Sequence, residues 1–194
     1  MRIAIIDYGA GNVRSVQFAL ERIGYQASCT NLIDEIREAD KVIFPGVGEA
    51  SSAMAELKRY GLDELIPRLE QPVLGICLGM QLMCRFSEEN NTECLGIFPV
   101  DVLRFDEKHK VPQIGWNRIT SLGSGLFRGL EEGSYVYYVH SYYIPDNNFS
   151  IASTDYGLVY SGAIWKDNFY ACQFHPEKSS DVGERILKNF IETI

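Results

Sequence analysis

The residues best suited to chemistry lie in the run Gly75-Ile76-Cys77-Leu78-Gly79, where a buried-strand pattern meets a helical one. A nucleophile on such a sharp strand-to-helix turn is exposed at the carboxyl edge of a sheet, as the serine is in the G-x-S-x-G elbow. The partial positive charge of a helix N-terminus favours a thiolate there. Most free cysteines are small buried hydrophobic residues, so this run alone leaves both interpretations of Cys77 open.

A nucleophilic cysteine needs a base and a group that orients the base. Of the three histidines, His175 ends the strand pattern of residues 169–174 and is followed by Pro176 and Glu177. Because proline ends the strand and stiffens the turn, the carboxylate can fold back and fix the imidazole tautomer. An exposed histidine and a solvated acid are the commoner fates of such residues taken singly. In combination with Cys77 they predict a Cys77–His175–Glu177 triad.

The other two histidines fit less demanding roles. His109 lies in the polar run of residues 106–110, which is expected to be a solvated loop. His140 follows the aromatic run of residues 135–139. It fits either a hydrogen-bonded structural histidine or the wall of a pocket.

A glycine-rich loop, Pro45-Gly46-Val47-Gly48, follows another buried-strand pattern. Its glycines let backbone N–H groups point at a ligand, as an oxyanion hole requires, although a plain strand-to-helix turn has the same composition. The carboxyl ends of neighbouring parallel strands share one crevice, so we expect this loop beside Cys77. Gly9-Ala10-Gly11 is a poor dinucleotide fingerprint, because the third glycine would fall at Arg14.

The elements that position these residues alternate between strands and helices in the first half of the chain. This alternation predicts a mostly parallel sheet flanked by helices. Residues 7–11 form the expected first turn, Asn12 is a good N-cap, and Gly24 can close the helix in a left-handed conformation. The expected strands are residues 3–6, 42–44 and 73–77, and the expected helices are residues 13–23 and 78–86.

The second half changes character. Short aromatic and β-branched runs between about residues 100 and 174 predict additional, partly antiparallel strands. A last helix carries one apolar stripe, formed by Val182, Ile186, Leu187, Phe190 and Ile191. Without an internal repeat, low-complexity segment or linker, residues 1–194 are predicted to form a single α/β domain.

Composition limits the classes of function. The net charge of −8 provides no basic surplus for a nucleic-acid backbone. No apolar run approaches the roughly 20 residues that cross a bilayer, and residues 1–7 meet an acid too early for a signal peptide. The five cysteines are irregularly spaced without a C-x-x-C pair, which argues against a disulfide framework or a zinc site. We therefore expect a cytoplasmic protein that binds no metal, membrane or nucleic acid.

The runs Gly75-Ile76-Cys77-Leu78-Gly79-Met80-Gln81 and Phe174-His175-Pro176-Glu177 resemble the signatures of class I (triad-type) glutamine amidotransferases. Further segments are similar to the branch of that family that serves histidine biosynthesis, and the similarity covers essentially the whole chain in order. These segments are Asp7-Tyr8-Gly9-Ala10-Gly11-Asn12, Pro45-Gly46-Val47-Gly48, Gly115-Trp116-Asn117, Val139-His140-Ser141-Tyr142 and Lys178-Ser179-Ser180. The cysteine elbow is widely shared, whereas Gly-Trp-Asn together with His-Pro-Glu-Lys-Ser is more specific.

The resemblance implies a glutamine amidotransferase type-1 domain over residues 1–194 and a role for each matching residue. The implied catalytic triad is Cys77, His175 and Glu177. The implied oxyanion donors are the backbone N–H groups of Val47 and Leu78. The positions that match the glutamine-binding residues of the family are Gly48, Gln81, Glu89, Ser141 and Tyr142. The positions that match its partner-facing residues are Asn12, Trp116, Tyr137 and Lys178. No cofactor is implied.

The implied activity is hydrolysis of L-glutamine to glutamate and ammonia. The ammonia is channelled to the cyclase (synthase) subunit of a heterodimer that makes imidazole glycerol phosphate and AICAR in histidine biosynthesis. One departure is Pro112-Gln113-Ile114, where the family often has Pro-His-Met, so the role of that histidine is open here. A paralogous subunit that feeds a nucleotide-sugar or cofactor synthase remains an alternative. A non-enzymatic interaction protein would need a damaged triad, and a cysteine peptidase would act on peptides rather than glutamine.

Overall fold

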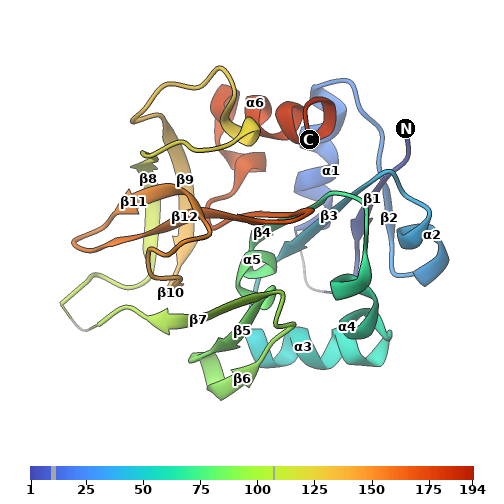
Figure 1. The fold of residues 1–194 in the computed structure, drawn as a ribbon, viewed down its shortest axis with the longest axis horizontal. Coiled ribbons are helices and arrows are strands. Elements are labelled where there is room, and N and C mark those ends of the chain that lie inside the picture. The colour runs from blue at the N-terminus through green and yellow to red at the C-terminus, as the bar shows by residue number, and fades with distance from the viewer. Residues whose placement is uncertain (10–11, 107) are drawn as a thin grey trace.

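The computed structural model describes residues 1–9, 12–106 and 108–194, and it shows a central sheet with helices on both faces (Figure 1). The strands of this sheet are, in spatial order, β11 (Ser150–Asp155), β12 (Val159–Lys166), β13 (Phe169–Cys172), β4 (Val73–Cys77), β3 (Lys41–Gly46), β1 (Ile3–Ile6) and β2 (Ser28–Thr30). The strands from β13 to β2 pair in parallel, whereas β12 pairs antiparallel with both of its neighbours. The prediction of a mostly parallel sheet is therefore confirmed.

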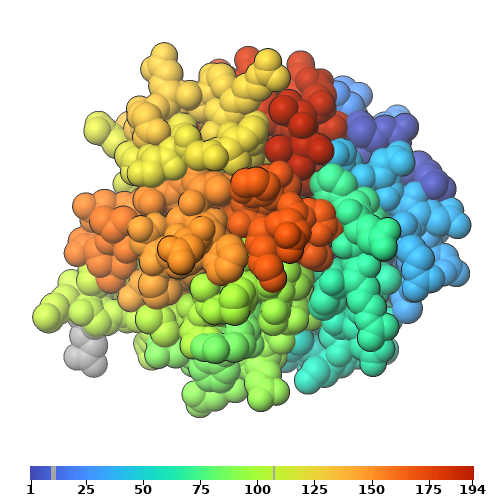
Figure 2. Space-filling model, in the orientation of Figure 1, coloured from blue at the N-terminus to red at the C-terminus, as the bar shows by residue number. Residues whose placement is uncertain are grey.

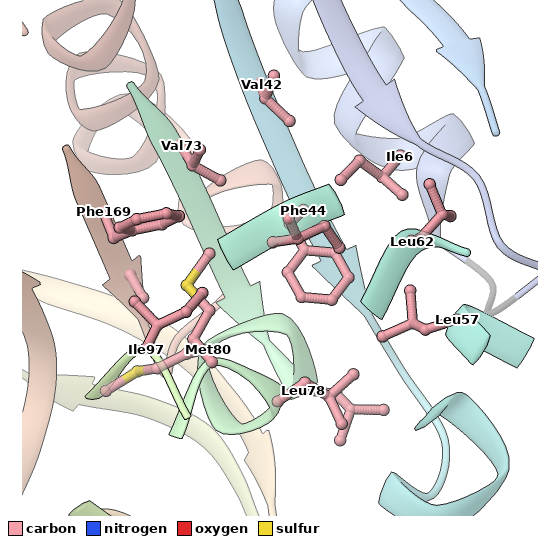
Figure 3. Close-up of a cluster of buried hydrophobic side chains, with 14 of the residues drawn as sticks. Ile6, Val42, Phe44, Leu57, Leu62, Val73, Leu78, Met80, Ile97 and Phe169 are labelled. Carbon is pink, nitrogen blue, oxygen red and sulfur yellow. The ribbon is translucent and has the colours of Figure 1, made fainter. Parts of the chain in front are cut away.

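The helices cover both faces because successive side chains of the central strands are apolar and point in opposite directions. Ile5 of β1 packs into one core and Ile6 into the other. The first core is covered by α1 (Val13–Arg22) and α6 (Ser180–Glu192), and the second by α2 (Ile33–Arg37), α3 (Ala50–Arg59), α4 (Leu62–Leu65) and the 3₁₀ turn η1 (Ile66–Arg68). Phe44 and Leu57 meet in this second core (Figure 3). Among the helices of the described residues, none combines the length and the apolar character needed to cross a membrane.

Two smaller sheets contain the remaining strands of the described residues. One contains, in order, β10 (Tyr142–Tyr143), β7 (Phe98–Arg104), β5 (Cys84–Ser87) and β6 (Thr92–Glu93), and the other is the hairpin of β8 (Gln113–Arg118) and β9 (Tyr135–His140). All of their pairings are antiparallel except that of β5 with β7, which confirms the predicted mixture. In Figure 2, the orange strands of residues 150–166 lie between the green surface of β5 and β6 and the yellow surface of the segment after β8.

The predicted helix over residues 78–86 is wrong in its second half. The helix α5 spans only Leu78–Leu82, and the chain continues as β5. The segment after β6 returns beside it, so that Leu95 N–H donates to the Leu82 carbonyl (2.9 Å) and Phe98 N–H donates to the Met83 carbonyl (3.0 Å). These tertiary bonds satisfy the backbone groups that a longer helix would use, and they override its helical pattern.

The predictions for the helix ends had mixed outcomes. Gly24 follows α1 with φ +90°, as expected for a left-handed closing residue. The apolar stripe of α6 is buried at Ile186, Leu187, Phe190 and Ile191, as predicted. Asn12 occupies the predicted N-cap position of α1, but its side chain makes no capping bond and donates instead to Glu177. Within the predicted turn of residues 7–11, Ala10 and Gly11 lie outside the described residues.

A close backbone contact fixes the start of α5 against β3. A Cβ atom built on Gly79 would lie 1.9 Å from the Phe44 carbonyl oxygen, and one built on Gly46 would lie 2.8 Å from the Gly79 nitrogen. Neither position tolerates a side chain without movement of the backbone. The two glycines therefore bring α5 and the glycine-rich loop after β3 into direct contact.

We expect Gly79→Ala to lower the free energy of unfolding by about 1–3 kcal/mol, because the methyl group overpacks a backbone contact that cannot relax by rotating a side chain. Chemical denaturation of the purified protein measures this change. Gly123→Ala is the matched control, since its Cβ would meet its nearest neighbour at an ordinary 3.8 Å. Equal stability of the two variants would contradict the role of the Gly79 contact.

Candidate active site

Cys77 occupies a strained turn between β4 and α5. Its backbone has φ +54° and ψ −109°, a conformation that costs a side-chain-bearing residue about 1–3 kcal/mol. Cys77 is paired with Gly46 at the ends of β4 and β3, so the glycine-rich loop begins beside the sulfur. The expectation that the loop and Cys77 share one crevice is therefore confirmed.

His175 reaches the same crevice from β13, the parallel neighbour of β4 on its other side. Its Nδ1–H group donates to Glu177 Oε1 over 2.8 Å, and both side chains are buried. Its other ring nitrogen is left for Cys77, which lines the same pocket as His175. The short turn η4 (Pro176–Lys178) folds the carboxylate back, as the sequence predicted. The structure thus brings Cys77, His175 and Glu177 together.

The two buried histidines at the site have opposite protonation tendencies. Burial lowers the pKa of His175, but the charge and hydrogen bond of Cys77 and the contact with Glu177 outweigh it and raise that pKa above its ordinary value. Burial lowers the pKa of His140 to about 4, only partly offset by its bond to the Tyr142 carbonyl. At neutral pH, His175 is therefore an imidazolium that can donate a proton, and His140 is neutral.

A pocket of about 330 Å³ opens over Cys77, at the small end of the roughly 300–1,000 Å³ that small-molecule sites occupy. The sequence-predicted residues that line it are Val47, Gly48, Cys77, Leu78, Gln81, Glu89, Ser141, Tyr142, His175 and Lys178. All five positions that match glutamine-binding residues are among them. A larger groove of about 460 Å³ between α2 and α4 is lined mainly by surface side chains and contains none of these groups.

Glu89 connects the pocket to the loop after β3. It lies in the 3₁₀ turn η2 (Glu89–Asn91), and its Oε2 accepts a hydrogen bond from the Ala50 N–H at the start of α3 (2.8 Å). Burial raises the pKa of this carboxyl group, and the bond from Ala50 partly offsets the effect. Glu89 thus presents a partly buried acid to the pocket and holds the far end of the loop that contains Val47.

The four positions that match partner-facing residues do not behave alike. Trp116 is 52% exposed and packs edge-on against Tyr137, with ring centroids 5.9 Å apart. Lys178 lines the pocket. Asn12 reaches inward, since its side-chain amide donates to Glu177 Oε1, the oxygen that also accepts from His175. Asn12 therefore contacts the triad acid directly, which the sequence reasoning did not anticipate.

Sequence reasoning also missed the contacts of Gln113 and misjudged His109. Gln113 is buried, and its Oε1 lies 3.1 Å from His140 Nε2 and 3.0 Å from the Tyr160 hydroxyl. Its place directly before Gly115-Trp116-Asn117, where the family often has histidine, was the available signal. The solvated-loop prediction holds for Asp106, Lys108 and Lys110, which are exposed, whereas the His109 ring packs on Phe105 with centroids 5.6 Å apart. Glu107 in the same loop lies outside the described residues.

Two further buried residues contact the groups that form the site. Tyr8 is fully buried, and its hydroxyl donates to the Pro45 carbonyl at the base of the glycine-rich loop (3.3 Å). Gln173 is also fully buried, and its Nε2 lies 3.7 Å from Cys77 Sγ. Tyr8 belongs to a segment that carried the resemblance and Gln173 directly precedes another, but the sequence gave no sign that these polar atoms face the site. Among the described residues, no group of three or more His, Cys, Asp or Glu side chains is arranged to hold a metal.

We expect His140 and His175 to titrate differently in an NMR experiment on the imidazole Cε1–H signals. His175 should remain charged from pH 5 to pH 8 and His140 should remain neutral, because their pKa values are displaced in opposite directions. Cys77→Ala removes the group that most strongly raises the pKa of His175, so that pKa should fall. A His175 signal that titrates identically in both proteins would contradict the pairing with Cys77.

Comparison with known proteins agrees with this geometry. A family model described as glutamine amidotransferase class-I matches residues 4–194. The imidazole glycerol phosphate synthase subunit HisH of Bacteroides fragilis is 58% identical, over 99% of this chain and 100% of that protein. The protein of the same name from Haemophilus influenzae is 46% identical, over 100% of this chain and 98% of that protein.

A solved structure shows the same fold at much lower identity. It is described as PurLQS from Thermotoga maritima, with a TM-score of 0.77 and 16% identity over 98% of this chain and 97% of that chain. The family model and the full-length relatives are decisive, and this chain belongs to the class I glutamine amidotransferase family.

Proposed function

We propose that this chain is the glutaminase subunit of an imidazole glycerol phosphate synthase. It hydrolyses L-glutamine to glutamate and passes the ammonia to a cyclase (synthase) subunit in a heterodimer. The observation that carries the proposal is the pocket in which Cys77 and the buried His175–Glu177 pair meet all five positions matched to glutamine binding. The relatives at 58% and 46% identity favour this synthase over a paralogous one.

The chemistry follows from the arrangement of the side chains. The Cys77 thiolate attacks the carboxamide carbon of glutamine, and the negative charge moves to the carboxamide oxygen. The Leu78 N–H at the first position of α5 has no intrahelical partner, so it is available to that oxygen together with the Val47 N–H. The His175 imidazolium gives its proton to the departing nitrogen, which leaves as ammonia.

The second half of the reaction uses the same residues. Neutral His175 removes a proton from water, whose oxygen attacks the γ-glutamyl thioester carbon. The carbon–sulfur bond breaks, glutamate leaves, and Cys77 and His175 return to their starting states. Glu177 holds the imidazole in one tautomer throughout, through its bond to Nδ1.

An exposed apolar face supports the proposed partner. Ile114, Trp116 and Tyr135 of the β8–β9 hairpin are 63%, 52% and 48% exposed, and they alternate with less exposed residues of the same strands. Large exposed apolar surfaces of this kind are typical of protein interfaces. The proposed domain spans residues 1–194, and the free cysteines suit a protein that works in the cytoplasm.

Cys77→Ala should abolish glutamine hydrolysis, because Cys77 supplies the sulfur of the thioester. The complex with the partner should still make product from added ammonium salt, which shows that the loss is confined to the glutaminase reaction. Conservative substitution of Cys29, Cys84, Cys94 or Cys172 is the control and should alter stability more than turnover. Substantial glutaminase activity in Cys77→Ala would rule out the proposed nucleophile.

We also expect the isolated chain to be a poor glutaminase that its partner activates when the acceptor substrate is bound. Glycine makes the peptide planes of residues 46–48 easy to reorient, so the Val47 N–H need not face the pocket in the resting state. Gaining one oxyanion donor raises turnover about 10²–10³-fold. Turnover is compared for the chain alone, with partner, and with partner plus an acceptor analogue. Lys178→Ala should weaken the response, and equal turnover in all three conditions would contradict the switch.

A further inference from the structure

We propose that Gln173 is a further catalytic residue, whose side-chain N–H donates a hydrogen bond to the Cys77 sulfur and stabilises it as the attacking thiolate. This proposal rests on the proposed glutaminase function. Gln173 is fully buried between β13 and His175, and its Nε2 lies 3.7 Å from Cys77 Sγ, within the longer range of hydrogen bonds to sulfur. A polar side chain with no solvent exposure requires such partners.

The direction of the Gln173 amide follows from a chain of contacts that starts at a backbone carbonyl. The Tyr142 carbonyl oxygen can only accept, so the Gln81 atom 3.1 Å from it must be the nitrogen. That nitrogen also lies 3.0 Å from Gln173, which must therefore present its oxygen to Gln81. The Gln173 nitrogen is then the atom that faces Cys77. The donor role does not depend on an arbitrary choice between amide oxygen and nitrogen.

Apart from the N-terminus of α5, few groups near the Cys77 sulfur can stabilise a negative charge on it. The Val139 carbonyl lies 3.7 Å from Sγ and can accept from a thiol but offers nothing to a thiolate. His175 stabilises the thiolate only until it gives its proton to the departing ammonia. Gln173 has no proton to lose at neutral pH, so its N–H remains directed at the sulfur when Cys77 leaves the thioester. A donor of this kind acts in both halves of the reaction.

Several titratable groups surround Cys77, so a pH test must separate Gln173 from them. They are His175, Glu177 and Lys178 around η4, Cys172 on β13, Tyr8 after β1, His140 on β9, Tyr142 on β10 and Glu89 on η2. Gln173, unlike these groups, does not titrate. Its replacement by an apolar side chain of similar length removes the donor to Cys77 and the acceptor of Gln81 without adding or removing a charge.

The first test measures alkylation of Cys77 by iodoacetamide in the full-length protein, with the Cys77 peptide resolved from the other cysteine peptides by mass. In Gln173→Met, the rate at pH 7 relative to the rate at pH 10 should fall about ten- to a hundredfold, as expected for loss of a hydrogen bond to a charged group. In the complex with the partner, kcat should fall while KM for glutamine changes by less than about threefold. An unchanged rate ratio overturns the proposal.

Asn189→Leu is the matched control. Asn189 is a buried amide on α6 whose nitrogen donates to the Leu126 and Arg128 carbonyls, away from the pocket. Its replacement measures the general effect of removing a buried amide and should leave the alkylation ratio of Cys77 unchanged. A fall equal to that of Gln173→Met would attribute both effects to loosened packing and would overturn the proposal.

A second measurement needs no substitution at Gln173, so it decides the question even where Gln173→Met does not fold. One side-chain N–H proton of ¹⁵N-labelled Gln173 should resonate downfield in the wild-type protein relative to Cys77→Ala, while the Asn189 amide signals stay in place. Identical Gln173 signals overturn the role of this residue. An active Cys77→Ala would instead overturn the proposed glutaminase function, so the two failures are distinguishable.

Discussion

Gly79 lets the first turn of α5 lie against the Phe44 carbonyl of β3, at a distance that leaves no space for a side chain. This contact holds three features of the site close to one another. They are the turn that carries Cys77, the free N–H groups at the start of α5, and the glycine-rich loop at the end of β3. Because β3 and β4 pair in register up to Gly46 and Cys77, a shift of either strand would separate the loop from the sulfur. The strained backbone of Cys77 persists because the surrounding packing holds it.

The second constraint is electrostatic. Burying a charge costs several kcal/mol unless it is paired, and this crevice buries an imidazole and a carboxylate within two residues of each other. Hydrogen bonds offset part of that cost, because His175 Nδ1–H and the Asn12 amide both donate to Glu177 Oε1. Glu177 Oε2 is buried without a hydrogen-bond partner among the described residues. The same low-dielectric surroundings that make the arrangement costly also strengthen each interaction within it. Neutral His140 adds hydrogen bonding to the wall of the pocket without adding a further charge.

Local patterns in the sequence predicted the parts of the structure that depend on local chemistry. The buried strands, the elbow at Cys77 and the turn from His175 to Glu177 follow from apolar runs, flanking glycines and one proline. The early end of α5 could not be predicted from local patterns, because it depends on hydrogen bonds from residues more than ten positions away. One of these joins Leu95 N–H to the Leu82 carbonyl. The inward amide of Asn12 was likewise hidden, since a good N-cap residue is equally able to donate to a distant carboxylate.

The oxygen shared by His175 and Asn12 also connects the reacting groups to the edge of the molecule. Asn12 precedes α1 at its N-cap position, in a left-handed conformation with φ +83°. Lys178 directly follows Glu177 and lines the mouth of the pocket. Both residues match partner-facing positions of the family. The proposed partner, bound at this edge, would act on the hydrogen bonds that orient His175 without entering the pocket. Its effect would be limited by how differently it binds the two orientations.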